Sequence, residues 1–147
     1  MELVWNEWFV EYMTRASGKR GLVWKLLDCL ETKRDVLAVR YRSPLVSKFY
    51  RYAKLHPIPP DNTPFKRFFM MMRDPAKVRL VYDQEIVPLP QDVAALVPDD
   101  DLYLIELANV TTEKTVVTTD ETLQKRLNGV AGFRVLVLQE FLEYYHL

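Results

Sequence analysis

The sequence predicts a three-layer α/β/α fold with a central, mostly parallel sheet of about five strands. Two observations lead to this prediction. Short runs of apolar and β-branched residues alternate along the chain with stretches whose apolar residues recur at helical spacing. Helices placed between strands imply right-handed crossovers, which cover both faces of a parallel sheet. A length of 147 residues with 49% apolar side chains fits one such domain, residues 1–147.

Each expected element has a local signal. The strands are expected at residues 2–5, 35–40, 78–82, 115–118 and 134–137. The helices are expected at residues 8–12, 22–33, 44–55, 65–72, 99–109, 121–127 and 139–145. Ser43 and Pro44 form an N-cap and first-turn pair that starts one helix. A proline-rich stretch at 57–64 predicts a stiff connector that is too short to separate two domains.

Composition excludes several classes of protein. With 27% charged residues beside the large apolar fraction, the chain is not of the disordered class. The lone cysteine, Cys29, cannot form an internal disulfide, and no apolar run is long enough to span a bilayer. The N-terminus does not have the pattern of a signal peptide. We therefore expect a soluble, cytoplasmic domain that is not bound to a membrane.

The net charge of zero conceals an asymmetry. Residues 1–80 hold 16 of the 20 basic residues but only 8 of the 20 acidic ones. A basic half facing an acidic half would suit a protein that holds a phosphate backbone beside a metal-binding cluster. Alternatively, the unlike charges simply interleave on the folded surface. The charge count by itself favours the second interpretation.

Acidic residues occur where the predicted topology would place a site. In parallel sheets, ligands bind beyond the carboxyl ends of the strands, and Asn6, Asp120 and the cluster 99–101 are expected there. Asp101 and Asp120 each begin a helix, so each alone is well explained as an N-cap. Together, they are able to bind one divalent cation, because Mg²⁺ and Mn²⁺ prefer carboxylate oxygens.

These stretches resemble a known family. Residues 100–108 and 116–123 look like the C-terminal half of a PIN domain, and residues 132–142 are similar to its last strand and helix. Residues 35–55 resemble its second strand and the helix that follows. PIN domains are α/β/α nucleases, and many are the ribonucleases of toxin–antitoxin pairs. The resemblance therefore implies RNA as a substrate and Mg²⁺ or Mn²⁺ as a cofactor.

The family holds its metal with acids after the first strand, on the helix after the second strand, and at two later positions. Asp101 and Asp120 match the two later acids, whereas Asn6 and Lys48 stand at the other two positions. The resemblance thus implies Asp101, Asp120 and Asn6 as catalytic residues. Asp101 and Asp120, with Asp100 beside them, are the expected metal ligands.

The two missing acids leave two functions open. Asparagine removes a charge and lysine reverses one, so the ion is expected to be weakly bound or absent. Glu7 is disfavoured as a replacement, because adjacent residues of a strand point to opposite faces. One interpretation is an endoribonuclease with a weakened metal site, and the other is an inactive PIN-like module for nucleic-acid binding or assembly. Four basic residues are expected to contact nucleic acid: Arg42, Lys48, Arg51 and Lys54.

The helix expected at 65–72 carries more apolar residues than one face can bury. Its core-facing stripe is expected to consist of Phe65, Phe68, Phe69 and Met72. Met70 and Met71 would then be exposed, and an exposed apolar patch often marks a partner surface. We expect a homodimer or an antitoxin-like protein contact there, unless the connector 57–64 folds over the two methionines.

Overall fold

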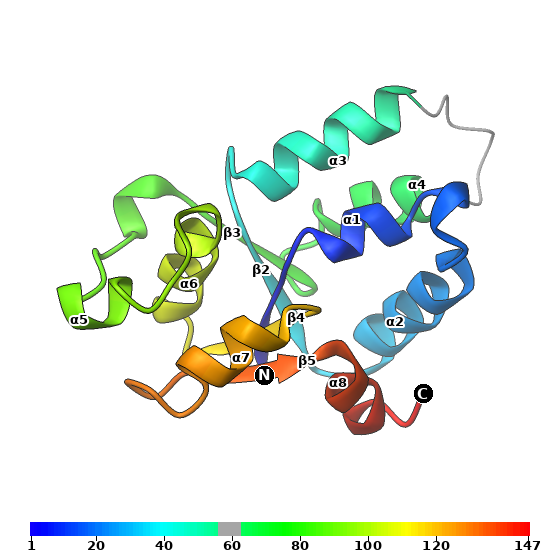
Figure 1. Ribbon diagram of the computed structural model, residues 1–147. Coiled ribbons are helices and arrows are strands. Elements are labelled where there is room, and N and C mark those ends of the chain that lie inside the picture. Colours follow the sequence, from blue (N-terminus) through cyan, green and yellow to red (C-terminus); the bar gives the residue numbers. More distant parts are fainter. Residues whose placement is uncertain (56–62) are drawn as a thin grey trace.

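The structure is a computed structural model that describes residues 1–55 and 63–147. Most of the expected connector 57–64 therefore lies outside the described residues. One five-stranded sheet forms the centre of the fold (Figure 1). Its strands are β1 (Glu2–Trp5), β2 (Val36–Arg40), β3 (Val78–Val81), β4 (Thr115–Thr118) and β5 (Arg134–Val137). All five agree with the sequence prediction to within one residue at each end.

The strands pair in the order β3-β2-β1-β4-β5, and every pairing is parallel. Eight α-helices occur in the described residues. They are α1 (Trp8–Tyr12), α2 (Arg20–Thr32), α3 (Pro44–Leu55), α4 (Pro64–Met71), α5 (Gln91–Ala94), α6 (Leu102–Asn109), α7 (Glu121–Leu127) and α8 (Leu138–Tyr144). Among these helices none is both long and apolar enough to span a membrane.

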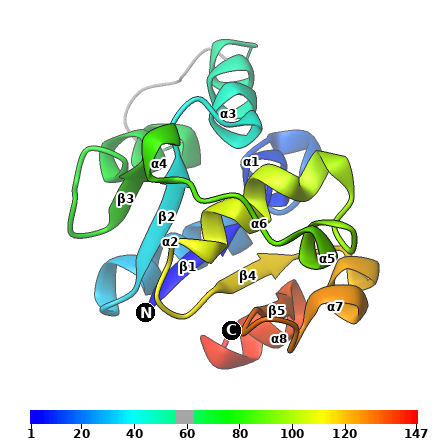
Figure 2. The ribbon, with the colours of Figure 1, turned by 90° about the vertical axis from the view of Figure 1, so that its left-hand side faces the viewer.

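Two hydrophobic cores lie on opposite faces of the sheet, so the fold has three layers (Figure 2). Successive strand residues point to opposite faces: Leu3 and Trp5 belong to one core, and Val4 to the other. The first core is covered by α1, α2, α3, α4 and α8, and the second by α5, α6 and α7. The predicted α/β/α sandwich is confirmed.

The segment between β3 and β4 differs from the prediction. Residues 99–101 form a short 3₁₀ turn, η3 (Asp99–Asp101), and α6 begins only at Leu102. A second 3₁₀ turn, η2 (Asp83–Glu85), and α5 lie between β3 and η3. The sequence predicted that the acidic cluster 99–101 directly follows a strand, and this prediction is wrong. These elements have three or four residues each, which is too short to produce a periodic apolar pattern.

Helix α4 is rotated relative to the expected stripe. Phe65, Phe68 and Met71 are buried, whereas Phe69 is 40% exposed and Met70 is 54% exposed. The prediction is confirmed for Met70 but wrong for Met71 and for Phe69. The helix packs against α2 and the first core, and the row spaced by three residues is the one buried in that contact, with Met72 partly buried against the same core.

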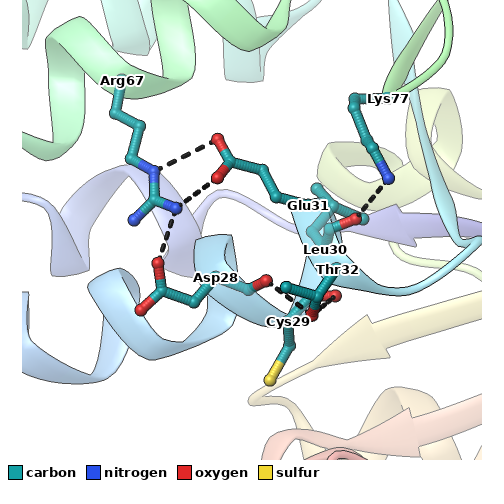
Figure 3. Close-up of polar contacts among 7 residues, drawn as sticks. All are labelled: Asp28, Cys29, Leu30, Glu31, Thr32, Arg67 and Lys77. Atoms are coloured by element: carbon teal, nitrogen blue, oxygen red, sulfur yellow. Dashed lines mark hydrogen bonds and ion pairs between the residues drawn. The ribbon is translucent and has the colours of Figure 1, made fainter.

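An ion-pair network joins α2 to α4 (Figure 3). The Arg67 Nη2 atom lies 2.6 Å from Asp28 Oδ1 and 2.6 Å from Glu31 Oε2, and its Nε donates to Glu31 Oε1 at 3.3 Å. The same guanidinium lies 5.0 Å from the ring centroid of Trp24. Lys77 Nζ donates to two carbonyl oxygens at the end of α2, which lack partners within the helix. This network clamps the two helices together.

Candidate functional site

The topology identifies one switch point, beyond the carboxyl ends of β1 and β4, and we refer to this place as the crevice. The chain passes from β1 to β2 and β3 on one side and then returns to β4 on the other side of β1. The connections after β1 and β4 therefore leave the sheet in opposite directions, and ligands of open parallel sheets bind at such a point. Figure 2 shows β1 and β4 side by side, with α6 lying across them. Asn6 follows β1 directly, and Thr118 ends β4.

The Asn6 side chain is held by hydrogen bonds to the backbone of Glu7 and to the end of β4. Its Oδ1 accepts from the backbone N–H of Glu7 at 2.7 Å, and its Nδ2 donates to Thr118 Oγ1 at 3.4 Å. The side chain also hydrogen-bonds the Asp101 carboxylate. Because the backbone N–H occupies Oδ1, the amide nitrogen faces the acids. Asn6 is thus placed to orient Asp101 by donating a hydrogen bond rather than to bind a cation through its oxygen.

Asp120 is the N-cap of α7. Its Oδ1 accepts from the backbone N–H groups of Thr122 at 2.8 Å and Leu123 at 3.2 Å. Its own N–H donates to Thr118 Oγ1 at 3.1 Å, so one threonine hydroxyl joins Asp120 to Asn6. The predicted capping role is confirmed, but it uses only one carboxylate oxygen. The second oxygen makes no hydrogen bond within the described residues and is available to a ligand.

Asp101 lies at the start of α6, and its side chain makes no capping hydrogen bond. Asp101 thus occupies the predicted N-cap position of α6, but its carboxylate does not serve as a cap. Burial raises the pKa of Asp101, and repulsion from Asp120, Asp100 and Glu7 raises it further, while the hydrogen bond from Asn6 acts in the opposite direction. The charges of residues far apart in the sequence therefore converge on this carboxyl group.

Glu7 belongs to this cluster, although strand alternation argued against it. The strand ends at Trp5, and Glu7 already has helical backbone angles, φ −59° and ψ −18°, as the N-cap residue of α1. The alternation rule does not apply beyond the last strand residue, so Glu7 and Asn6 both face the crevice. The strand was expected to end at Trp5, as it does, and the position of Glu7 beyond that end is the signal that would have included it.

Tyr103 is a further polar group that sequence reasoning missed. Its hydroxyl is buried and has no hydrogen-bond partner in the part of the chain that the structure describes. Burial, with the charges of Glu7 and Asp101, raises its pKa. A buried hydroxyl beside two carboxylates remains a donor, and it requires an acceptor that the described residues do not supply. Its position two residues after Asp101 is the only sequence clue.

The donor set suits a hard divalent cation, but it is incomplete. Asp101, Asp120 and Glu7 offer carboxylate oxygens, which Mg²⁺ and Mn²⁺ prefer. Within residues 1–55 and 63–147, however, no three acidic, histidine or cysteine side chains lie close enough to hold one ion. Asp101 and Asp120 are the two best placed ligands, and Asp100 is exposed beside them. Mg²⁺ is commonly held by one or two carboxylates, with water and substrate phosphate as its other ligands.

The expected basic residues do not form one group. Lys48 Nζ pairs with Glu11 Oε1 on α1 and lies 5.7 Å from the ring centroid of Tyr52. Lys54 lies ten residues after Pro44, about 15 Å along α3. Arg42, in contrast, lines a pocket together with Asp99 and Tyr103, next to the acids.

The crevice thus combines two carboxylates, an amide that orients one of them, a third charge from Glu7 and a buried hydroxyl without a partner. Such a group is able to attract a cation and to donate a hydrogen bond to an anionic substrate. No protein-family model matches the chain, and no curated protein or solved structure is significantly similar to it.

Proposed function

We propose that the chain is a PIN-like, Mg²⁺- or Mn²⁺-dependent endoribonuclease with a weakened metal site. The observation that supports this most is the convergence of Glu7, Asp101 and Asp120 at the crevice beyond β1 and β4. No cationic side chain of the described residues pairs with Asp101 or Asp120. Burial and then repulsion from Asp120 raise the pKa of Asp101, and a divalent cation would relieve that repulsion.

Each residue has a role in this proposal. Asp101 and the unoccupied oxygen of Asp120 would hold the ion, which supplies Lewis-acid stabilisation of the phosphoryl group and an activated water. Asn6 orients the Asp101 carboxylate, and Glu7 adds the charge that an asparagine at position 6 lacks. The Tyr103 hydroxyl donates a hydrogen bond to a substrate oxygen.

The test is cleavage of a mixed single-stranded RNA pool with Mn²⁺ present, comparing the wild type with Asp120→Asn. Asparagine also caps helices well, so the variant removes the charge and retains the cap of α7. We expect cleavage to fall by roughly 100-fold or more, because the charge acts on the transition state. Glu121→Gln is the matched control: it removes an exposed charge from the next residue and should leave the rate unchanged.

A second function is an inactive PIN-like module that binds nucleic acid or assembles with a partner. It is favoured because no three acidic, histidine or cysteine side chains of the described residues lie close enough to hold one ion. In that case neither the wild type nor Asp120→Asn would cleave RNA, and RNA binding would weaken steeply with salt. Measurable cleavage at the same rate by the wild type and Asp120→Asn would contradict both proposals.

Asn6→Asp tests whether position 6 belongs to the metal site. It adds a carboxylate beside Asp101 and should tighten Mn²⁺ binding, measured by calorimetry, by roughly tenfold. Lys48→Glu should not add to this effect, because Lys48 faces Glu11 and not the crevice. Unchanged Mn²⁺ affinity in Asn6→Asp would remove position 6 from the proposed site.

We further propose that the protein acts in the cytoplasm and that Met70 and Phe69 form a contact with a second copy or with an antitoxin-like protein. Both side chains are exposed next to each other on α4. Met71, which was expected to share this contact, is buried and takes no part in it.

A further inference from the structure

Two tyrosines stand side by side at the carboxyl edge of the sheet. Tyr41 follows β2 and Tyr82 follows β3, and these strands are neighbours. Their ring centroids lie 5.1 Å apart, and the side chains are 43% and 41% exposed. Tyr41 N–H donates to Val81 O at 2.8 Å, and Tyr82 N–H donates to Glu85 Oε2 at 2.8 Å. The backbone below both rings is therefore fixed, while a large part of each residue remains exposed to solvent.

Arg42 adds a cation to the tyrosine pair. Its guanidinium carbon lies 5.4 Å from the ring centroid of Tyr41. The residue has φ 58°, in the left-handed region that side chains other than glycine rarely adopt. No carboxylate of residues 1–55 and 63–147 pairs with it. The guanidinium therefore carries an unbalanced positive charge next to an exposed ring, which an anionic or aromatic ligand is able to contact.

A pocket of about 370 Å³ is lined both by Arg42, which lies against the ring of Tyr41, and by Tyr103 of α6. Arg42 and Ser43 line it on one side, and Asp99 and Tyr103 line it on the other. Tyr103 is the residue whose hydroxyl lies beside Glu7 and Asp101. The residue that contacts Tyr41 and the residue that senses the charges of the crevice therefore share one pocket.

The charges of the pocket indicate which part of a ligand enters it. Arg40 is neutralised by Asp83 at 3.1 Å and by Glu106 at 3.5 Å, and Asp99 adds another negative charge. A buried phosphate would be repelled by these acids. A neutral base, in contrast, can donate to carboxylates and accept from arginine, while its phosphate remains outside near Arg42.

We infer that Tyr41, Tyr82 and Arg42 bind the unpaired bases of single-stranded nucleic acid and lead the strand to the acidic crevice. The inference rests on the proposed function for its choice of ligand. Bases stack on exposed aromatic rings irrespective of sequence, and arginine contributes through its charge. In a duplex the base faces are covered, so the surface selects single strands.

The experiment measures binding of a fluorescently labelled, mixed-sequence RNA oligonucleotide by anisotropy, with EDTA present so that no cleavage takes place. The variant Tyr41→Ala with Tyr82→Ala should bind the single strand roughly tenfold or more weakly than the wild type. Tyr41→Phe with Tyr82→Phe retains both rings and should bind nearly as well as the wild type. Tyr144→Ala removes a ring of equal exposure from α8 and is the matched control. Circular dichroism verifies that each variant is folded.

The outcomes separate this inference from the proposed function. If the folded double alanine variant binds as tightly as the wild type, or if the duplex binds as tightly as the single strand, the inference is overturned. Failure of the wild type to bind the single strand also overturns it and favours a protein partner for the tyrosines. Cleavage with Mn²⁺ is measured separately. If the wild type does not cleave RNA but the double alanine variant still binds more weakly than the wild type, the tyrosine site is supported and the nuclease proposal is rejected.

Discussion

Two acidic clusters of this protein differ in what neutralises them. On α2, Asp28 and Glu31 lie within 2.6 Å of the Arg67 guanidinium (Figure 3). At the crevice, Asp101 and Asp120 have no such cation among the described residues. The same residue types therefore stabilise a helix pair in one place and repel each other in the other. A carboxylate whose charge is balanced has a structural role, whereas an unbalanced group is free to bind a cation.

The pKa shifts express this difference. Burial opposes the charge of Arg67, but hydrogen bonds to Glu31 and Asp28 outweigh burial and raise its pKa, which favours the charged form. The pKa of Asp101 is also raised, by burial and by Asp120, but for an acid this favours the neutral form. The charged form of Arg67 is therefore favoured in the folded protein, whereas the charged form of Asp101 is disfavoured.

The largest expected effect on the free energy of unfolding is in the core beneath the α2–α4 clamp, the ion pairs of Arg67 with Asp28 and Glu31. Met71 is 5% exposed, and Met71→Ala should lower the free energy of unfolding by about 2–4 kcal/mol, because it leaves a cavity in the first core. Met70→Ala, one residue away and exposed, should change it by less than about 0.5 kcal/mol. Urea denaturation measures both values. Equal losses would show that α4 packs in a different rotation.

A smaller effect is expected from the clamp itself. Arg67→Ala leaves Asp28 and Glu31 without their shared cation and should cost about 1–2 kcal/mol of unfolding free energy. The loss should shrink in high salt. Arg73→Ala removes an exposed arginine two residues after α4 and serves as the control. If Arg67→Ala also abolished cleavage or metal binding, the separation between the two clusters would be incorrect.

At the crevice, removal of a carboxylate should stabilise the fold, whereas removal of Arg67 should destabilise it. Because the folded protein raises the pKa of Asp101, ionisation of this group destabilises the fold above that pKa, and the penalty disappears as the pH falls through it. Asp101→Asn should therefore melt at the same or a higher temperature than the wild type at neutral pH. The difference should vanish on acidification, which thermal denaturation across a pH series can follow. A lower melting temperature at neutral pH would contradict the repulsion.

The smallest effect on stability is expected at the surface of α4. Met70→Lys should leave the melting temperature unchanged, since the side chain is 54% exposed. If Met70 forms the proposed contact with a second copy, the variant should be monomeric where the wild type is dimeric in size-exclusion chromatography with light scattering. A monomeric wild type that Met70→Lys does not alter would exclude the homodimer.

Local pattern was sufficient for most of the elements. The strands are encoded by short apolar and β-branched runs and the longer helices by helical spacing, and both signals act over a few residues. Ser43 with Pro44 marks the start of α3 as expected. The failures have local causes too. The elements η2, η3 and α5 are too short to show a period, and the apolar residues of α4 allow more than one buried row.

The sequence by itself determined the alternation of strands and helices, the parallel sheet and the placement of Asn6 and Asp120 at strand ends. Only the tertiary structure decided which side chains meet. The strand order β3-β2-β1-β4-β5 brings β1 next to β4, and this joins Asn6 to Thr118 across 112 positions of the chain. The tertiary structure also decided that the charge of Glu7 acts on Asp101, and that Lys48 pairs with Glu11 and not with a group of the crevice. Such contacts depend on the packing of elements distant in sequence, which no short-range pattern encodes.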